Sequence, residues 1–131
     1  MKVRELIESF YYAASGIMYV MKTQKNMRIH FFIAVLVILL SLLLDISKTE
    51  MMILVFAISL VVVAEMINTA VEKTIDLYTK DYHPLAKTAK NVAAGAVLIA
   101  ALNSLVVAYF VFLNRVIALL KETLHHFGFM R

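Results

Sequence analysis

Four polar residues near the middle of the chain have types and spacing that suit chemistry: Glu65, Asn68, Glu72 and Asp76. At 100° per residue, their side chains fall within one helical stripe about 80° wide. They follow a strongly apolar run at residues 51–64. Acidic side chains in a membrane segment carry a large solvation cost, so residues of this kind are candidates for function.

The position along the helix gives each acid a different depth. With 1.5 Å per residue from position 51, Glu65 lies about 21 Å and Glu72 about 31 Å along the span. The hydrocarbon core is about 30 Å thick. We therefore expect Glu65 inside the cytoplasmic leaflet, Glu72 near the interface and Asp76 outside. A carboxyl group in apolar surroundings suits a general base or a proton carrier.

A lysine at the start of the next apolar run extends this set. Lys90 could pair with Glu72 or Asp76, or hold phosphate groups as a point charge. Spacing alone leaves several chemistries open. Ion pairs that stabilise an oligomer are one, and a proton-coupled transporter is another, although three short helices are few for alternating access. A phosphotransferase that binds Mg²⁺ through carboxylates and phosphate through lysine fits the whole set.

The composition indicates the kind of element that must position these residues. Hydrophobic residues make up 63% of the 131 positions, against about 45–50% in soluble domains. The chain has no cysteine, which excludes disulfides and thiolate metal sites. Its net charge of +4 is scattered, and without a basic block nucleic-acid binding is not expected. The sequence predicts an all-α membrane protein.

Three apolar runs, at residues 29–44, 51–64 and 92–113, supply the spanning helices. Each reaches about 20 residues once its flanks are added. Ser47 or Thr49 is the expected cap of the second helix, and Pro84 suits the first turn of the third. The predicted elements of this single integral-membrane domain, 1–131, are a surface helix at about 3–24, spans at about 28–46, 50–78 and 86–113, and a C-terminal tail at 114–131.

The N-terminal segment is too polar at its start to span. Its apolar residues recur at helical spacing, which predicts an amphipathic helix lying in the interface. Lysine and arginine are more frequent in this segment than in the first link, which carries only Lys48, and the second link with the residues after it carries Lys80, Lys87 and Lys90. The positive-inside rule therefore places the N-terminus and the second link in the cytoplasm, with the chain crossing the plasma membrane.

The polar stripe and its surroundings resemble a known family. The run EMINTAVEKTID at 65–76, together with YHPLAK at 82–87, AKN at 89–91 and AAGAV at 93–97, is similar to the signature of the prokaryotic diacylglycerol kinases. The resemblance covers roughly residues 10–112. The runs HPL at 83–85, GAV at 95–97 and NMRIH at 26–30 resemble the Gram-positive branch, whose members are undecaprenol kinases.

The resemblance implies a homotrimer that uses ATP and Mg²⁺ to phosphorylate a lipid alcohol at the cytoplasmic interface. It implies that Glu65 is the general base that takes the proton of the lipid hydroxyl. Glu72 would then ligate the metal, and Lys90 would contact the phosphates of ATP. The remaining residues implied to organise the site or face the nucleotide are Asn68, Asp76, Asp81, Tyr82, His83 and, on the surface helix, Tyr12.

Two positions depart from the family pattern. Gln24 stands where many relatives have a second metal-binding glutamate, and Asn91 follows Lys90 where they have an aspartate. An amide can ligate a metal through its carbonyl oxygen, but it brings no charge. We keep Gln24 as a candidate metal ligand and Asn91 as a candidate nucleotide contact, and we expect weaker Mg²⁺ binding than in relatives with the full acidic set.

The sequence therefore predicts a membrane lipid kinase, with undecaprenol as the first choice of substrate. A diacylglycerol kinase that makes phosphatidic acid is the alternative within the same class, because the apolar spans do not discriminate the two lipids. A non-enzymatic membrane assembly, or a proton or ion pathway, is the alternative from another class.

Overall fold

The computed structural model describes residues 3–126, with the side chains of Asn114 and residues 122–126 excepted. Its four helices are α1 (Val3–Thr23), α2 (Lys25–Leu43), α3 (Lys48–Tyr78) and α4 (Pro84–His126). Three of them, α2, α3 and the Pro84–Lys121 part of α4, are long and apolar enough to cross a membrane. The predicted all-α architecture with three candidate spans is confirmed.

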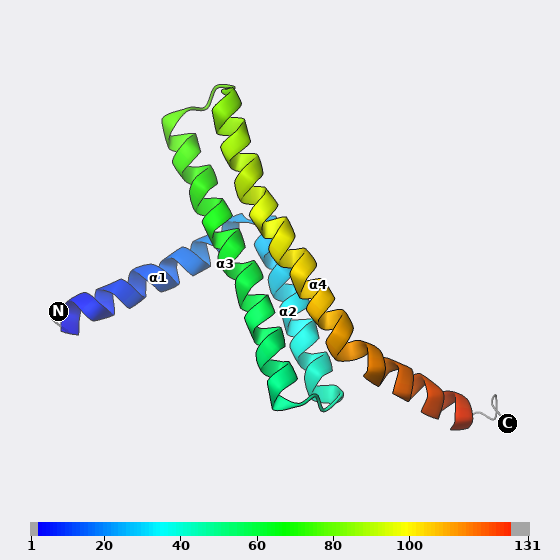
Figure 1. Ribbon diagram of the computed structural model, residues 1–131. Helices are drawn as coiled ribbons and strands as arrows, with labels where there is room; N and C mark the ends of the chain where they lie inside the picture. Colours follow the sequence, from blue (N-terminus) through cyan, green and yellow to red (C-terminus); the bar gives the residue numbers. More distant parts are fainter. Residues whose placement is uncertain (1–2, 127–131) are drawn as a thin grey trace.

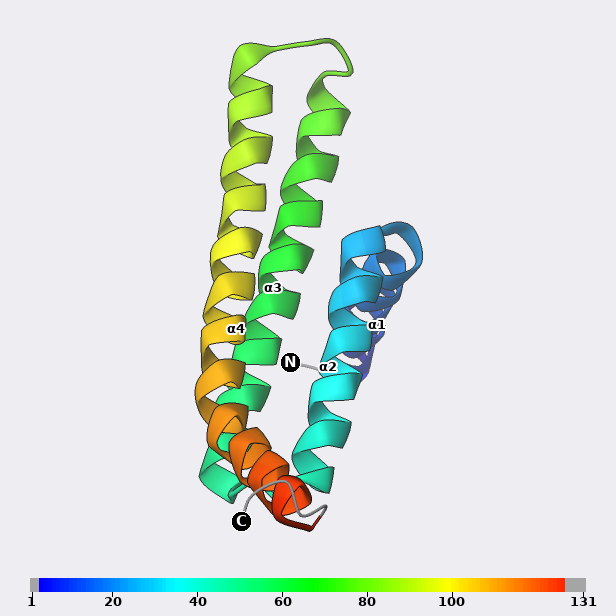
Figure 2. The ribbon, with the colours of Figure 1, turned by 90° about the vertical axis from the view of Figure 1, so that its right-hand side faces the viewer.

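The long helices α3 and α4 form an antiparallel hairpin, and α2 lies alongside it (Figures 1 and 2). The helix α1 joins the bundle at the start of α2 and extends away from it to one side (Figure 1). Its apolar side chains stay largely uncovered, with Phe10, Tyr11 and Tyr12 each 69% exposed. An apolar helix that the bundle does not cover fits the predicted surface helix.

The packed face of α3 follows from its sequence. Leu54, Ala57 and Val61 are all at most 5% exposed, and their spacing of three and four residues places them on one side of a helix. At the lower end of the hairpin, Leu54 packs with Val111 and Phe112 of α4. Most other apolar side chains of the three candidate spans face outward, as expected where lipid replaces water.

After both links, the next helix begins as the sequence predicts. Ser47 caps α3: its hydroxyl accepts from the backbone N–H of Glu50, while the Glu50 carboxylate accepts from the backbone N–H of Ser47. Such a capping box satisfies N–H groups that lack partners within the helix. Pro84 begins α4. Asp45 has a φ of 47°, a left-handed conformation that ends α2 before the predicted boundary near residue 46.

The last helix is longer than the predicted span. It continues beyond residue 113 to His126, so the segment predicted as a tail is helical as far as the structure describes it. The helix changes direction in its orange part, where it leaves the bundle (Figure 1). The last residues of the predicted tail, 127–131, lie outside the described part of the chain.

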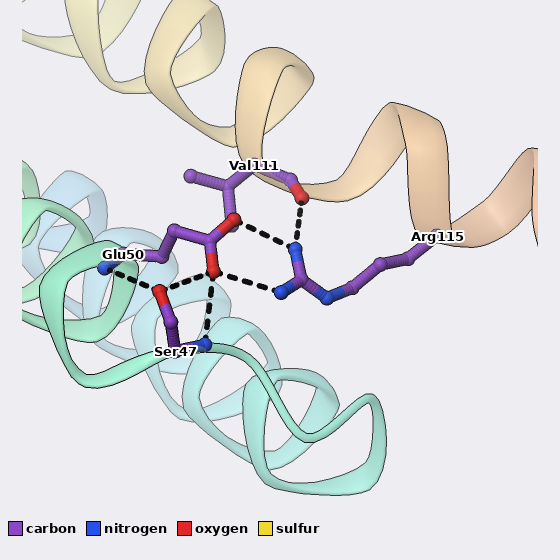
Figure 3. A network of polar contacts seen from close by, with 4 residues as sticks. All are labelled: Ser47, Glu50, Val111 and Arg115. Carbon is purple, nitrogen blue, oxygen red and sulfur yellow. Dashed lines mark hydrogen bonds and ion pairs between the residues drawn. The ribbon is translucent and has the colours of Figure 1, made fainter.

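Arg115 joins this end of α4 to the start of α3 (Figure 3). Its two terminal nitrogens donate to the two carboxylate oxygens of Glu50 at 2.7 and 2.8 Å, and one of them also donates to the carbonyl oxygen of Val111 at 3.1 Å. The same carboxylate takes part in the capping box with Ser47. Local sequence patterns did not indicate this contact, because it joins positions far apart in the chain.

The lengths of α2 and α3 determine where the polar stripe of Glu65, Asn68, Glu72 and Asp76 lies along the bundle. The 19 residues of α2 are about 28 Å long and the 31 residues of α3 about 46 Å. Because α2 and α3 run antiparallel from a short link, Glu65 lies close to the level at which α2 begins. The part of α3 that carries Glu72 and Asp76 therefore extends beyond α2, with the first part of α4 beside it (Figure 2).

Candidate active site

Glu65 continues the packed face of α3 beyond Val61. It is 2% exposed, and its Oε2 atom has no hydrogen-bond partner in the described part of the chain. The hydroxyl of Thr69 donates to the backbone carbonyl of Glu65 at 2.9 Å. It therefore does not serve as a donor to the Glu65 carboxylate. Burying a carboxylate oxygen without a partner is costly, and such a group calls for a functional explanation.

Asn68 and Glu72 follow on the same face. The side-chain amide of Asn68 donates to Oε1 of Glu72 at 3.4 Å. Asn68 is 7% exposed, and its Oδ1 also lacks a partner among the described residues. Two unsatisfied oxygens thus lie one turn apart on the polar stripe. Both are acceptors that a donor from a ligand, from water or from another chain would satisfy.

Asp76 and Lys90 connect α3 to α4. The ammonium group of Lys90 donates to the Asp76 carboxylate at 2.6 Å. Of the two partners that the sequence suggested for Lys90, the structure selects Asp76. The two side chains are 39% and 46% exposed, so water weakens the pair and Lys90 remains accessible to a phosphate group.

A groove of about 230 Å³ opens around the link between α3 and α4. The cations on its wall are Lys80, Lys87 and Lys90. The ammonium group of Lys87 lies 5.9 Å from the centre of the Tyr82 ring, at cation–π distance. The groove brings together these predicted site residues: Asp76, Asp81, Tyr82, His83, Lys90 and Asn91. Lysines, a histidine and an exposed aromatic ring suit a phosphorylated ligand with a flat base.

The two site residues predicted in the N-terminal part lie apart from this groove. Tyr12 is on the exposed face of α1. Its ring centre lies 5.7 Å from that of Tyr11, and the two rings meet edge to face. Gln24 occupies the elbow between α1 and α2 as the N-cap of α2, but its side chain makes no capping hydrogen bond. Because α2 begins near the level of Glu65, the free amide of Gln24 is on the same level as the polar stripe.

The donor set limits which metal site this chain can build. Among the side chains that the structure describes, which end at residue 121, no group of three or more from His, Asp or Glu is arranged to enclose a metal ion. Mg²⁺ differs from most metals because it is usually held by one or two carboxylates together with water and substrate phosphates. Glu72, with the side-chain amide of Asn68 beside it, suits a Mg²⁺ that binds together with a nucleotide.

Sequence reasoning missed His30 of α2. The imidazole interacts electrostatically with Glu65 and lines a cavity between α2, α3 and α4. In the sequence, His30 ends the run NMRIH and is, with Ser41, a polar residue within the first apolar run. Ser41 has a local explanation, since its hydroxyl donates to the carbonyl of Val37 at 2.7 Å.

Comparison with known proteins adds an independent line of evidence. A family model described as prokaryotic diacylglycerol kinase matches residues 11–112. A protein of Synechocystis sp. named diacylglycerol kinase is 44% identical over 103 residues, which cover 78% of this chain and 59% of that protein. A protein of Bacillus subtilis named undecaprenol kinase is 36% identical over 114 residues, which cover 87% of this chain and 93% of that one. A diacylglycerol kinase of Escherichia coli K12 is 32% identical over 65 residues, about half of each chain.

Proposed function

The chain belongs to the prokaryotic diacylglycerol kinase family, and on that premise we propose that it transfers the terminal phosphate of ATP to the hydroxyl of a membrane lipid alcohol. The observation that carries this proposal is the buried, unpartnered carboxylate of Glu65. It stands at the level where α2 begins, below a lysine-lined groove that is open to water. The lipid alcohol is anchored in the membrane, whereas ATP is soluble in water. In this arrangement the lipid can reach Glu65 and ATP can reach the groove.

In the proposed reaction, Glu65 accepts the proton of the lipid hydroxyl as the lipid oxygen bonds to the γ-phosphorus. The bond between this phosphorus and the bridging oxygen breaks, and ADP leaves. Lys90 holds the phosphates, and Asn68 keeps Glu72 in place through its amide. Phosphoryl transfer depends mainly on positioning and on charge stabilisation, which suits a site made of side chains without a glycine-rich loop.

Glu72, with Gln24 as an amide ligand, would hold the Mg²⁺ that accompanies ATP. The ion offsets the negative charge of the phosphates when it is bound. The nucleotide itself would lie against the exposed link, with Asp81, Tyr82, His83 and Asn91 in contact, and Tyr12 would approach it from α1. The exposed positions of these residues support this assignment.

We propose undecaprenol as the lipid and undecaprenyl phosphate as the product. The Bacillus subtilis undecaprenol kinase supports this choice because the match covers nearly its whole length. Diacylglycerol is the second candidate, favoured by the higher identity of the Synechocystis protein, of which the chain covers 59%. In either case we propose a homotrimer in the plasma membrane, with the N-terminus and the link between α3 and α4 in the cytoplasm.

The decisive test is phosphate transfer by the purified protein in mixed micelles that contain [γ-³²P]ATP and one lipid at a time. We expect labelled undecaprenyl phosphate, with a higher kcat/KM for undecaprenol than for diacylglycerol. The reverse preference would assign the protein to diacylglycerol. Transfer to neither lipid would overturn the proposed function.

The matched variant is Glu65→Gln, which keeps the shape of the side chain but cannot accept a proton. Loss of a general base costs about 10²–10⁴-fold in rate, so we expect kcat to fall in that range. Glu8→Gln is the control, because Glu8 pairs with Arg4 on the exposed surface of α1. Parental activity in Glu65→Gln would contradict the role of Glu65 as the base.

A further inference from the structure

A small cavity below the proposed site contains polar groups that the proposed reaction does not use. It measures about 70 Å³ and lies between α2, α3 and α4, with mostly apolar walls. His30 and Ser104 are its two polar lining residues. The Ser104 hydroxyl donates to the carbonyl of Ala101 at 2.8 Å, so its hydrogen is already used. The imidazole of His30 is the group on these walls that still has an N–H to donate.

Helix register directs this imidazole toward Glu65. His30 is as many residues before the end of α2 as Val61 is after the start of α3, and both line the cavity. Glu65 lies one turn above Val61 on the same face. Side chains lean toward the N-terminus of their helix, so Glu65 leans down along α3 and His30 leans up along the antiparallel α2. The two side chains therefore converge.

Glu65 and His30 are complementary as hydrogen-bond acceptor and donor. Glu65 is 2% exposed and has an oxygen without a donor, whereas a histidine ring always carries at least one N–H. The side chains that act electrostatically on Glu65 are His30 from α2 and Glu72 from α3 itself. Glu72 repels the carboxylate, so His30 is the attractive partner.

We propose that His30 is the positioning residue of Glu65: its ring N–H donates to the Oε2 atom that lacks a donor and holds the carboxylate ready for the lipid hydroxyl. The proposal rests on the proposed function for its consequence in catalysis. The contact between the two side chains does not depend on which lipid is phosphorylated.

The first test uses kinetics. His30→Phe keeps a flat ring of similar size but has no N–H, and we expect it to lower kcat about 10- to 100-fold while the KM values for lipid and ATP stay within about 2-fold. His30→Gln retains a neutral donor and should recover most of the loss. Ile33→Val changes the size of the same cavity without touching the pair, and should match the parent. Equal losses in His30→Phe and Ile33→Val, or no recovery in His30→Gln, would overturn the proposal.

The second test does not require kinase activity. Dicyclohexylcarbodiimide enters bilayers and reacts with protonated carboxyl groups, so its rate of reaction reports on Glu65. A carboxylate that has lost its donor is protonated more of the time. We expect several-fold faster modification of Glu65 in His30→Phe than in the parent or in Ile33→Val, and none at this position in Glu65→Gln.

Unchanged modification in His30→Phe would overturn the contact, even if the parent phosphorylates undecaprenol. A parent without activity on either lipid would overturn the proposed function and leave the contact to be decided by the modification rates. If His30→Phe does not fold, His30→Leu replaces it in both tests with the same expected outcomes.

Discussion

At the scale of single residues, the candidate site combines a buried carboxylate, Glu65, with few other acidic side chains that could hold the proposed Mg²⁺. Glu65 and Glu72 lie on one face of α3, and the amide of Asn68 donates to Glu72. At the elbow between α1 and α2, Gln24 offers an amide where a carboxylate would add a charge. Mg²⁺ prefers charged oxygen ligands, so the identity of residue 24 should control how much Mg²⁺ the protein requires.

The first prediction concerns this position. Gln24→Glu should lower the Mg²⁺ concentration for half-maximal activity several-fold, because a second carboxylate then faces the ion. Activity measured across a Mg²⁺ titration at saturating ATP checks this. Asn26→Asp adds the same charge to an exposed position two residues further along and should leave the Mg²⁺ requirement as in the parent. An unchanged requirement in Gln24→Glu would remove residue 24 from the metal site.

The second prediction concerns Lys90, which we propose contacts the phosphates of ATP. Lys90→Met removes a cation from the groove and should raise the KM for ATP about tenfold, as expected for a charge-assisted contact with phosphate. Initial rates at varied ATP provide the measurement. Lys73→Met is the control, since Lys73 is exposed on α3 and does not line the groove. Similar effects in both variants would indicate a general loss of positive charge instead of a specific contact.

At the scale of elements, the hairpin of α3 and α4 is held by ion pairs near both ends. Asp76 and Lys90 join the helices beside the groove, and Glu50 and Arg115 join them at the other end. The second pair is bidentate and is linked to the capping box of α3 through Glu50. Bidentate contacts within a network stabilise more than isolated surface pairs do. The pair therefore orders the start of α3 together with the bend of α4.

The third prediction follows from this network. Arg115→Gln should lower the Tm in detergent by a few degrees, because it leaves the Glu50 carboxylate without its guanidinium partner. Thermal unfolding followed by circular dichroism checks this. Arg4→Gln breaks the exposed pair with Glu8 and should leave the Tm unchanged. The kcat of Arg115→Gln should stay near the parental value, because Glu50 is at the opposite end of α3 from the groove. An unchanged Tm would show that the network adds no stability.

At the scale of the whole molecule, the outward-facing apolar side chains of α2, α3 and α4 form the surface that lipid or neighbouring copies would cover. The described part of α1 adds an uncovered apolar helix at the level where α2 begins (Figure 1). If this level is the cytoplasmic interface, the end of the hairpin with the groove projects into the cytosol. The groove can then take ATP from water while Glu65 stays near the lipid.

The fourth prediction tests this orientation in a chain that has no natural cysteine. Leu85→Cys, in the first turn of α4, should react with a membrane-impermeant maleimide in inside-out vesicles and not in intact cells. Thr49→Cys, in the first turn of α3, should show the opposite pattern. Both positions are exposed, so a difference in labelling reports the side of the membrane. Labelling of both positions from the same side would exclude the proposed topology.

The sequence by itself determined that the chain forms apolar helices, that Ser47 or Thr49 caps α3, that α4 starts at Pro84 and that Glu65, Asn68, Glu72 and Asp76 share one face. These properties depend on hydropathy, periodicity and capping, which act between residues close in the chain. Only the tertiary structure decided that Lys90 pairs with Asp76, that Arg115 reaches Glu50 and that His30 of α2 is close enough to Glu65 of α3 to act on it electrostatically. Each of these contacts joins two helices, so it depends on helix lengths and on the register of antiparallel packing, which no local pattern specifies.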